Sequence, residues 1–159
     1  MATWEQIKDI RLRINDPEGV INITSVATIN DLPAEPEPYT YYYVESSGAY
    51  VSKESGDTEY STLDISISDT RIGQWIDANG ADYAECMSYQ AIAGRLGKEL
   101  LLKKAQAGAE STEYQSLNDM YRYYKSLHDD CEKRRSSDTG YNAGRYADTK
   151  NPEIAGGNL

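Results

Sequence analysis

The chain of 159 residues has the length of one domain, or of one domain with an appendage. Its 26 acidic and 16 basic side chains give a net charge of −10, which argues against nucleic acid held by a general basic surface. Two cysteines and one histidine leave little for a zinc site or a disulfide framework, and no apolar run is long enough to span a membrane.

The first expected element is a helix from Thr3 to Ile14. Thr3 and Gln6 have the spacing of a capping box. Apolar side chains recur along this segment at spacings of three and four residues: Trp4, Ile7, Ile10 and Ile14. A strand over Val20 to Ile29 is possible, and the prolines that follow predict a stiff extended connector: Pro33, Pro36 and Pro38.

Between residues 39 and 67 the hydrophobic period changes to two, which indicates strands. Residues 41–45 and 49–53 flank Ser-Ser-Gly, a sequence that suits a hairpin turn. Residues 63–67 alternate isoleucine or leucine with polar residues and predict a half-buried strand. Two or three such short strands need a partner surface to be stable.

Three helices are expected next. Asp69 should cap a short one that ends at about Ala78, and a long one should run from about Asp82 to Ala107. Gly94 and Gly97 lie inside the long helix, where each costs about 1 kcal/mol relative to alanine. They make sense if another helix crosses there at close range.

The third of these helices is predicted from about Thr112 to Arg135, with Thr112 and Gln115 as its cap. Its last turn carries Lys133, Arg134 and Arg135, whose positive charges interact favourably with the helix dipole. These residues could instead contact phosphate, but stabilisation of the helix end is the simpler interpretation. The connector over residues 108–111 is short. We therefore expect the two long helices to form an antiparallel hairpin.

Residues 137–159 differ from the rest because they are rich in glycine and asparagine and show no periodicity. We expect this segment to be an extended docking tail that orders against a partner. The predicted domain organisation is a helical domain over residues 1–136, with a β insertion at about 39–67, followed by this tail. The predicted partner-binding residues of the tail are Tyr141, Arg145, Tyr146, Ile154 and Leu159.

No pattern in the sequence indicates a catalytic, cofactor or metal site, so we expect a protein that is not an enzyme. His128 adjoins two aspartates, but neighbouring helix positions point apart by about 100°, so a solvated or cap-proximal histidine is expected. Cys86 and Cys131 lie on the two long helices, which can bring them together in the folded hairpin; reduced, buried thiols are expected. No pair of carboxylates marks a glycosidase cleft.

The tyrosine-rich strands admit two interpretations. Tyrosine is enriched at protein interfaces, and it also stacks on sugar rings in carbohydrate-binding modules. Because these strands carry little charge and no visible metal ligands, an inter-subunit or tail-facing interface is the preferred interpretation. The residues predicted for it are Tyr41, Tyr43, Tyr50 and Tyr60.

The layout as a whole resembles the head-tail connector proteins of tailed bacteriophages, also called adaptor or head-completion proteins. Four stretches carry the resemblance: IRLRINDPEGVI (10–21), DLPAEPEPYTYYYVESSGAYV (31–51), the helical region over 63–135, and TGYNAGRYADTKNPEIAGGNL (139–159). It is a similarity of element order and texture, strongest from residue 68 onwards, without a catalytic signature. The tyrosine-rich insertion is larger than such adaptors require.

The resemblance implies a mainly α helical-bundle subunit of the virion, assembled in the host cytoplasm and located at the head-tail junction. About twelve copies would form a ring beneath the portal protein, and a stopper or tail-terminator protein would bind the other face. Genomic DNA would pass through without sequence-specific binding, as a chain of charge −10 favours. The alternative is a carbohydrate- or receptor-binding module that uses the tyrosine-rich segment.

Overall fold

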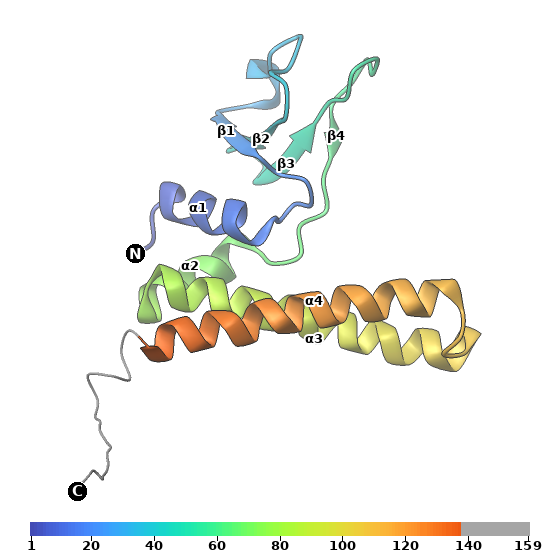
Figure 1. Ribbon diagram of the computed structural model, residues 1–159. Coiled ribbons are helices and arrows are strands. Elements are labelled where there is room, and N and C mark those ends of the chain that lie inside the picture. Colours follow the sequence, from blue (N-terminus) through green and yellow to red (C-terminus); the bar gives the residue numbers. More distant parts are fainter. Residues whose placement is uncertain (138–159) are drawn as a thin grey trace, which may run out of the picture. The chain divides into compact units, whose positions relative to one another are not determined.

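A computed structural model of the chain describes residues 1–137 (Figure 1). The fold is mainly α with a small sheet, as the sequence predicts, and this sheet is mixed and has four strands. The chain divides into two compact units, Met1–Ala81 and the part from Asp82 onwards. This boundary differs from the expected one. The sheet shares a core with Trp4 and Leu12 of the first helix in the N-terminal unit.

Helix α1 spans Trp4–Ile14 and begins with the predicted capping box. The Thr3 hydroxyl accepts a hydrogen bond from the Gln6 amide, and the Gln6 side chain accepts one from the Thr3 amide at 2.8 Å. Helix α2 spans Asp69–Asn79 and packs against α1. The prediction that Asp69 caps α2 is wrong: Ser68 is the cap, and the Asp69 carboxylate bonds to a buried arginine of α1 instead.

The sheet has the strand order β1-β2-β3-β4. Its strands are β1 (Asn22–Val26), β2 (Thr40–Val44), β3 (Ala49–Ser52) and β4 (Ser61–Thr62). Strands β2 and β3 form the predicted antiparallel hairpin, and β3 pairs antiparallel with β4. Strand β1 pairs parallel with β2. The connection between them contains a 3-10 helix, η1 (Ile29–Asp31), and the proline segment, which is residues 33–39.

Other side chains of the N-terminal unit cover both faces of this sheet. As a result, neither face presents a row of fully exposed tyrosines. On one face, Ile23 and Tyr50 pack with Trp4 of α1. On the other, Tyr42 and Val44 of β2 pack with Leu32 from the connection. Neither face of β2 is therefore fully exposed: Thr40, Tyr42 and Val44 are buried, and Tyr41 and Tyr43 are half-buried.

The predicted strand over residues 63–67 is wrong, because only Ser61–Thr62 pair with β3. The alternating side chains do enter the core, but the backbone groups of residues 66 and 67 bond to side chains. The Asp16 carboxylate accepts from the amides of Ser66 and Ile67, and the Ile67 carbonyl accepts from Arg11. These bonds use the groups with which a strand would pair.

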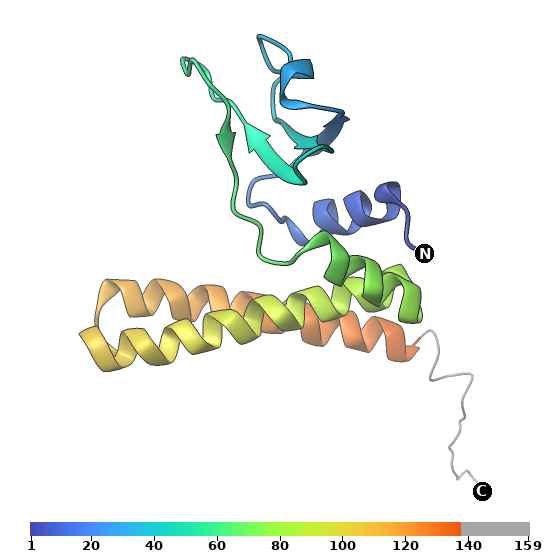
Figure 2. The same ribbon diagram turned by 180° about the vertical axis from the view of Figure 1, so that it is seen from behind.

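The second unit contains α3 (Ala81–Ala107) and α4 (Thr112–Arg135), which lie side by side in opposite directions (Figures 1 and 2). Lys103 and Glu113 form an ion pair of 3.1 Å near the connector. The bounds of α4 agree with the prediction, but its cap does not. The Ser111 hydroxyl accepts from the Tyr114 amide, and the Gln115 side chain donates to the Ala109 carbonyl, so the cap is one residue earlier than Thr112.

Cys86 and Cys131 form a disulfide between α3 and α4, with their Cα atoms 5.5 Å apart. The expectation of two reduced thiols is therefore wrong in this structure. Both residues are buried, and the antiparallel helices bring them within the range of Cα separations that disulfides require. The sequence places the two cysteines on helices that can bring them together, but it does not indicate that they bond.

Candidate interaction surface

Tyr50, which the sequence assigned to an interface, is an internal residue. Its side chain is only 1% exposed, and its hydroxyl donates to the Asp69 carboxylate at 2.8 Å and accepts from Arg11 Nε at 2.8 Å. Burial, followed by the negative charge of Asp69, raises the pKa of Tyr50, so the hydroxyl stays protonated. The interface prediction is wrong for this residue, because alternation along a strand does not reveal what covers each face.

The other three predicted tyrosines are half-buried and have partners inside the N-terminal unit. Tyr43 stacks on Trp4, with ring centroids 4.3 Å apart. The Tyr41 hydroxyl donates to the Glu18 carbonyl, and the Tyr60 hydroxyl donates to the Pro33 carbonyl. Part of each ring stays exposed, but these side chains primarily hold the sheet, the proline segment and α1 together. The five predicted tail residues, Tyr141, Arg145, Tyr146, Ile154 and Leu159, lie outside the residues that the structure describes.

Arg11 is the centre of a buried polar cluster that joins α1, β3 and α2. Its guanidinium lies 3.0 Å from the Asp16 carboxylate and 2.6 Å from that of Asp69, and its side chain is fully buried. Burial lowers the pKa of Arg11, but Tyr50, Asp69 and Asp16 outweigh this effect, so the net shift of the pKa is upward. All these groups satisfy one another, as expected of a structural cluster.

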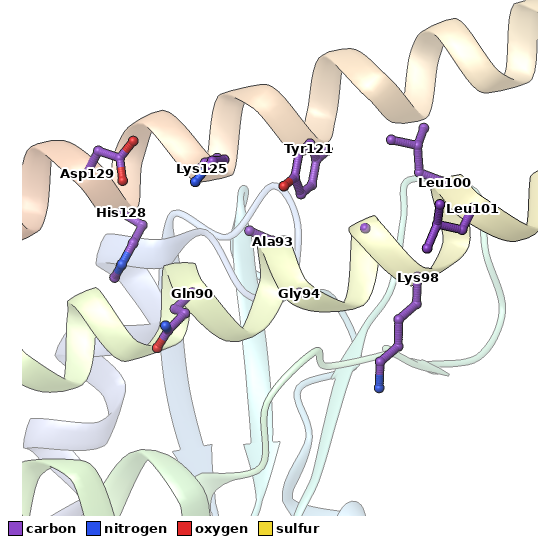
Figure 3. Close-up of a pocket in the computed structure, with 11 residues that line it drawn as sticks. Gln90, Ala93, Gly94, Lys98, Leu100, Leu101, Tyr121, Lys125, His128 and Asp129 are labelled. Atoms are coloured by element: carbon purple, nitrogen blue, oxygen red, sulfur yellow. The ribbon is translucent and has the colours of Figure 1, made fainter. Parts of the chain in front are cut away.

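The hairpin of α3 and α4 has a groove of about 650 Å³ along one side (Figure 3). Gly94 and Gly97 of α3 line it, and Tyr121 and His128 project from α4 toward α3. A Cβ atom at Gly97 would lie 3.3 Å from the Tyr121 ring, so this glycine does permit a close approach of the two helices. A Cβ atom at Gly94 would meet no atom within 4 Å, so the expected close crossing is absent there.

The sequence predicted a solvated or cap-proximal position for His128, and this prediction is wrong. It is half-buried, and its Nδ1 lies 3.1 Å from the Cys86 carbonyl oxygen across the hairpin. The contact holds α4 against α3 beside the disulfide. The basic residues at the end of α4 have partners too: Arg134 lies 3.4 Å from Glu85, and Arg135 contacts Glu132.

Charged and apolar groups flank the groove. Lys98 and Lys125 are among its lining residues, and neither forms an ion pair with any residue of the described range 1–137. Leu101, also on the groove, is 70% exposed. The hairpin exposes three further large apolar side chains: Leu102, Met120 and Tyr123. Three consecutive leucines, 100–102, cannot all face one helix partner. This run of leucines is the sequence signal from which the exposed apolar surface of the hairpin could have been predicted.

A second exposed surface lies on the connection between η1 and β2. Glu35, Glu37 and Tyr39 are exposed there, with Tyr39 at 76%, and its φ of 59° lies in the left-handed region. The residues form one wall of a cavity of about 790 Å³, and residues 52–57 form the other. A tyrosine with positive φ is uncommon and costs free energy.

The two units differ strongly in charge. Residues 1–81 have fourteen acidic and five basic side chains, which gives −9, whereas residues 82–137 have nine of each and are neutral overall. Nearly the whole negative charge of the chain is therefore in the N-terminal unit. Groups of histidine, cysteine and carboxylate side chains with the arrangement of a metal site are absent from residues 1–137, and no helix among those residues is long and apolar enough to cross a membrane.

Comparisons with protein-family models, with curated proteins and with solved structures find no match to this chain.

Proposed function

We propose that the chain is a structural subunit that assembles with copies of itself into a ring and acts as a head-tail connector of a tailed bacteriophage. The observation that carries the proposal is the set of exposed apolar side chains on the hairpin: Leu101, Leu102, Met120 and Tyr123. Isolated exposed apolar residues are ordinary, but four on one pair of helices, one of which (Leu101) lines an open groove, favour a surface that is covered in an assembly.

The order of the elements supports the connector role. The chain contains, in order, a short helix, a small sheet, a second short helix and two long helices. The resemblance to the adaptor proteins rests on this order of elements. The net charge of −10 supports a channel that does not hold a phosphate backbone, through which genomic DNA passes freely. The proposed partners are the portal protein on one face of the ring and a stopper or tail-terminator protein on the other. The proposed location is the head-tail junction of the virion.

Self-assembly is tested with the purified full-length protein. Its mass is measured by native mass spectrometry over a hundredfold range of concentration, and its particles are imaged by negative-stain electron microscopy. We expect closed rings of about twelve copies. A protein that stays monomeric at every concentration contradicts the proposal. Mixing with the portal protein of the same virion then tests docking, which deletion of residues 137–159 should abolish.

A carbohydrate- or receptor-binding module is the second candidate function. The observation in its favour is the cavity of about 790 Å³ between the proline segment and residues 52–57, where Tyr39 and Tyr41 offer aromatic rings and Glu35 and Glu37 offer hydrogen-bond acceptors. A glycan array discriminates between the two functions. Sugar-specific binding that is lost in Tyr39→Ala favours the module, and the absence of a sugar-specific signal favours the connector.

A further inference from the structure

The groove on the hairpin has no occupant from its own two helices. Gly94 leaves its floor open, because a Cβ atom there would meet nothing within 4 Å. The tyrosine ring of Tyr121 forms part of the wall, and Leu101 exposes most of its side chain at one end. A groove with a glycine floor, an aromatic wall and an apolar end suits an extended segment that carries prolines or an aromatic ring.

The rim of the groove is cationic. Lys98 on α3 and Lys125 on α4 line it from opposite helices, and neither amine has an ion-pair partner among residues 1–137. Asp129 is the carboxylate that lines the same groove, so its rim retains an excess of positive charge. The chemistry that complements it is an extended segment with two or more carboxylates close to an aromatic side chain.

The segment of residues 33–39, Pro-Ala-Glu-Pro-Glu-Pro-Tyr, has this chemistry. Its backbone is anchored within the N-terminal unit. The Pro33 carbonyl accepts from Tyr60, the Ala34 carbonyl accepts from Lys53 at 2.7 Å, and the Glu37 amide donates to the Tyr42 hydroxyl at 3.1 Å. These bonds fix the segment before binding, which reduces the entropy that binding costs.

Pro33 and Pro36 of the same segment are half-buried, whereas its acidic and aromatic side chains are exposed. Glu35, Glu37 and Tyr39 are exposed, and the two carboxylates form no ion pair with any residue of the described part of the chain. Tyr39 also holds a positive φ without a hydrogen bond of its hydroxyl within residues 1–137. An exposed tyrosine in a costly backbone conformation is explained if its ring packs against a partner outside its own unit.

We propose that the segment of residues 33–39 of one copy docks into the hairpin groove of a second copy, with Glu35 and Glu37 facing Lys98 and Lys125 and with Tyr39 packing beside Leu101 and Gly94. This inference rests on the proposed ring and names the contact that closes it. Segment and groove are different surfaces of the same chain, so the contact is head-to-tail. Head-to-tail contacts between identical subunits generate rings when the rotation closes. The contact also pairs the acidic unit of one copy with the cationic rim of the next.

Charge reversal in the full-length protein tests the contact. The double variant Lys98→Glu with Lys125→Glu, and separately Glu35→Lys with Glu37→Lys, should each weaken self-association at least about tenfold. The matched controls change the net charge equally on exposed positions elsewhere: Lys104→Glu with Lys133→Glu, and Glu18→Lys with Glu59→Lys. The controls should stay within about twofold of the unmodified protein. Circular dichroism checks that each variant is folded.

Mixing the two charge-reversed proteins gives the decisive result. Each groove then meets a segment of opposite charge, so the mixture should form rings of alternating copies at concentrations at which neither protein assembles alone. Rings from the unmodified protein together with undiminished assembly of both reversed variants overturn this contact and leave the proposed function standing. A failure of the unmodified protein to assemble at all overturns both.

A photo-cross-link shows whether the contact is between copies. p-Benzoylphenylalanine replaces Tyr39 in 15N-labelled protein, which is mixed with unlabelled protein before illumination. Cross-links from residue 39 to residues 94–101 or 121–125 of a chain with the other label support the proposal. Cross-links confined to chains of the same label, or to other residues, contradict it.

Discussion

The Arg11 guanidinium and the Asp16 carboxylate form an ion pair of 3.0 Å between Nη1 and Oδ2, and both side chains are almost completely buried. Asp16 directly follows Asn15, the C-cap of α1, and its carboxylate neutralises a charge inside the core. Its two oxygens accept from the amides of Ser66 and Ile67 as well. One carboxylate thus fixes the path of the chain between the sheet and α2.

The variant Arg11→Met should destabilise the N-terminal unit by about 3–5 kcal/mol, because it leaves the buried Asp16 carboxylate without its counter-ion. Urea denaturation followed by tryptophan fluorescence measures this change selectively, since Trp4 and Trp75 both belong to that unit. Arg13→Met is the matched control. It removes an exposed ion pair with Asp9 on the same helix and should cost less than about 1 kcal/mol. Equal losses in the two variants would contradict the structural role of Arg11.

The disulfide between Cys86 and Cys131 joins residues 45 positions apart. In the chain-entropy account a loop of this length stabilises the folded state by about 4 kcal/mol. The double variant Cys86→Ala with Cys131→Ala, or reduction of the unmodified protein, should therefore lower the stability of the hairpin by a few kcal/mol. Helix loss at 222 nm during denaturation measures it.

Tryptophan fluorescence is the internal control for that experiment, because both tryptophans lie outside the hairpin. Its denaturation midpoint should not change on reduction. Alkylation of the native, unreduced protein should also label neither cysteine. Labelling of both cysteines, or an unchanged helix signal after reduction, would show that the bond is not formed in solution.

Parts of the fold follow directly from the sequence. The cap at Thr3 and the three-four spacing after it predict α1 nearly to the residue, and the turn at Ser46–Gly48 predicts the β2–β3 hairpin. These signals are local: each depends on residues that are neighbours along the chain or one helical turn apart. The same holds for the end of α2 at Gly80.

The failures have a common physical cause, which is the action of residues far apart in the chain. Asp16 takes the backbone bonds of residues 66 and 67, so an alternating segment does not become a strand. Trp4 covers the sheet face on which Tyr43 and Tyr50 lie, so Tyr50 is buried and Tyr43 is half-buried, although both were expected at the surface. The groove escaped prediction for a similar reason: periodicity places Gly94 on a helix, but it does not say which side of α3 the partner helix covers.

The stability of the hairpin should fall in alkali because of Tyr89. Burial, followed by the charge of Glu85 and the hydrogen bond to it, raises the pKa of Tyr89 to about 12, compared with 10.0 for the unperturbed group. Below pH 10 the hydroxyl is protonated in both states, and its contribution is constant. Between pH 10 and about 12 only the unfolded chain loses this proton, so the free energy of unfolding falls by about 1.4 kcal/mol per pH unit.

Chemical denaturation at pH 8, 10 and 11, followed at 222 nm, measures this dependence. Tyr89→Phe removes the titrating group, so its free energy of unfolding should fall less steeply above pH 10 than that of the unmodified protein. Between pH 8 and 9 the two proteins should show the same dependence, which is the built-in control. Parallel curves across the whole range would mean that the Tyr89 hydroxyl is solvated.

The two glycines of α3 should respond differently to the same substitution. Gly94→Ala places a methyl group in open space and should stabilise the hairpin by up to about 1 kcal/mol through its higher helix propensity. Gly97→Ala brings its methyl group to 3.3 Å from the Tyr121 ring, so that part of the same gain is lost in moving the ring. Thermal and chemical denaturation at 222 nm measure both changes, and the gain should be larger at position 94.

A measurement of self-association tests whether the groove binds another copy, and it does so independently of the stability of the hairpin. If the floor at Gly94 receives a side chain from another copy, Gly94→Ala should weaken assembly several-fold although the single chain is more stable, because the methyl group occupies the space that the incoming ring needs. Gly97→Ala, whose methyl group faces α4, should change assembly less. Native mass spectrometry of the two variants at matched concentrations decides: a hairpin that becomes more stable and assembles equally well would place the contact between copies elsewhere.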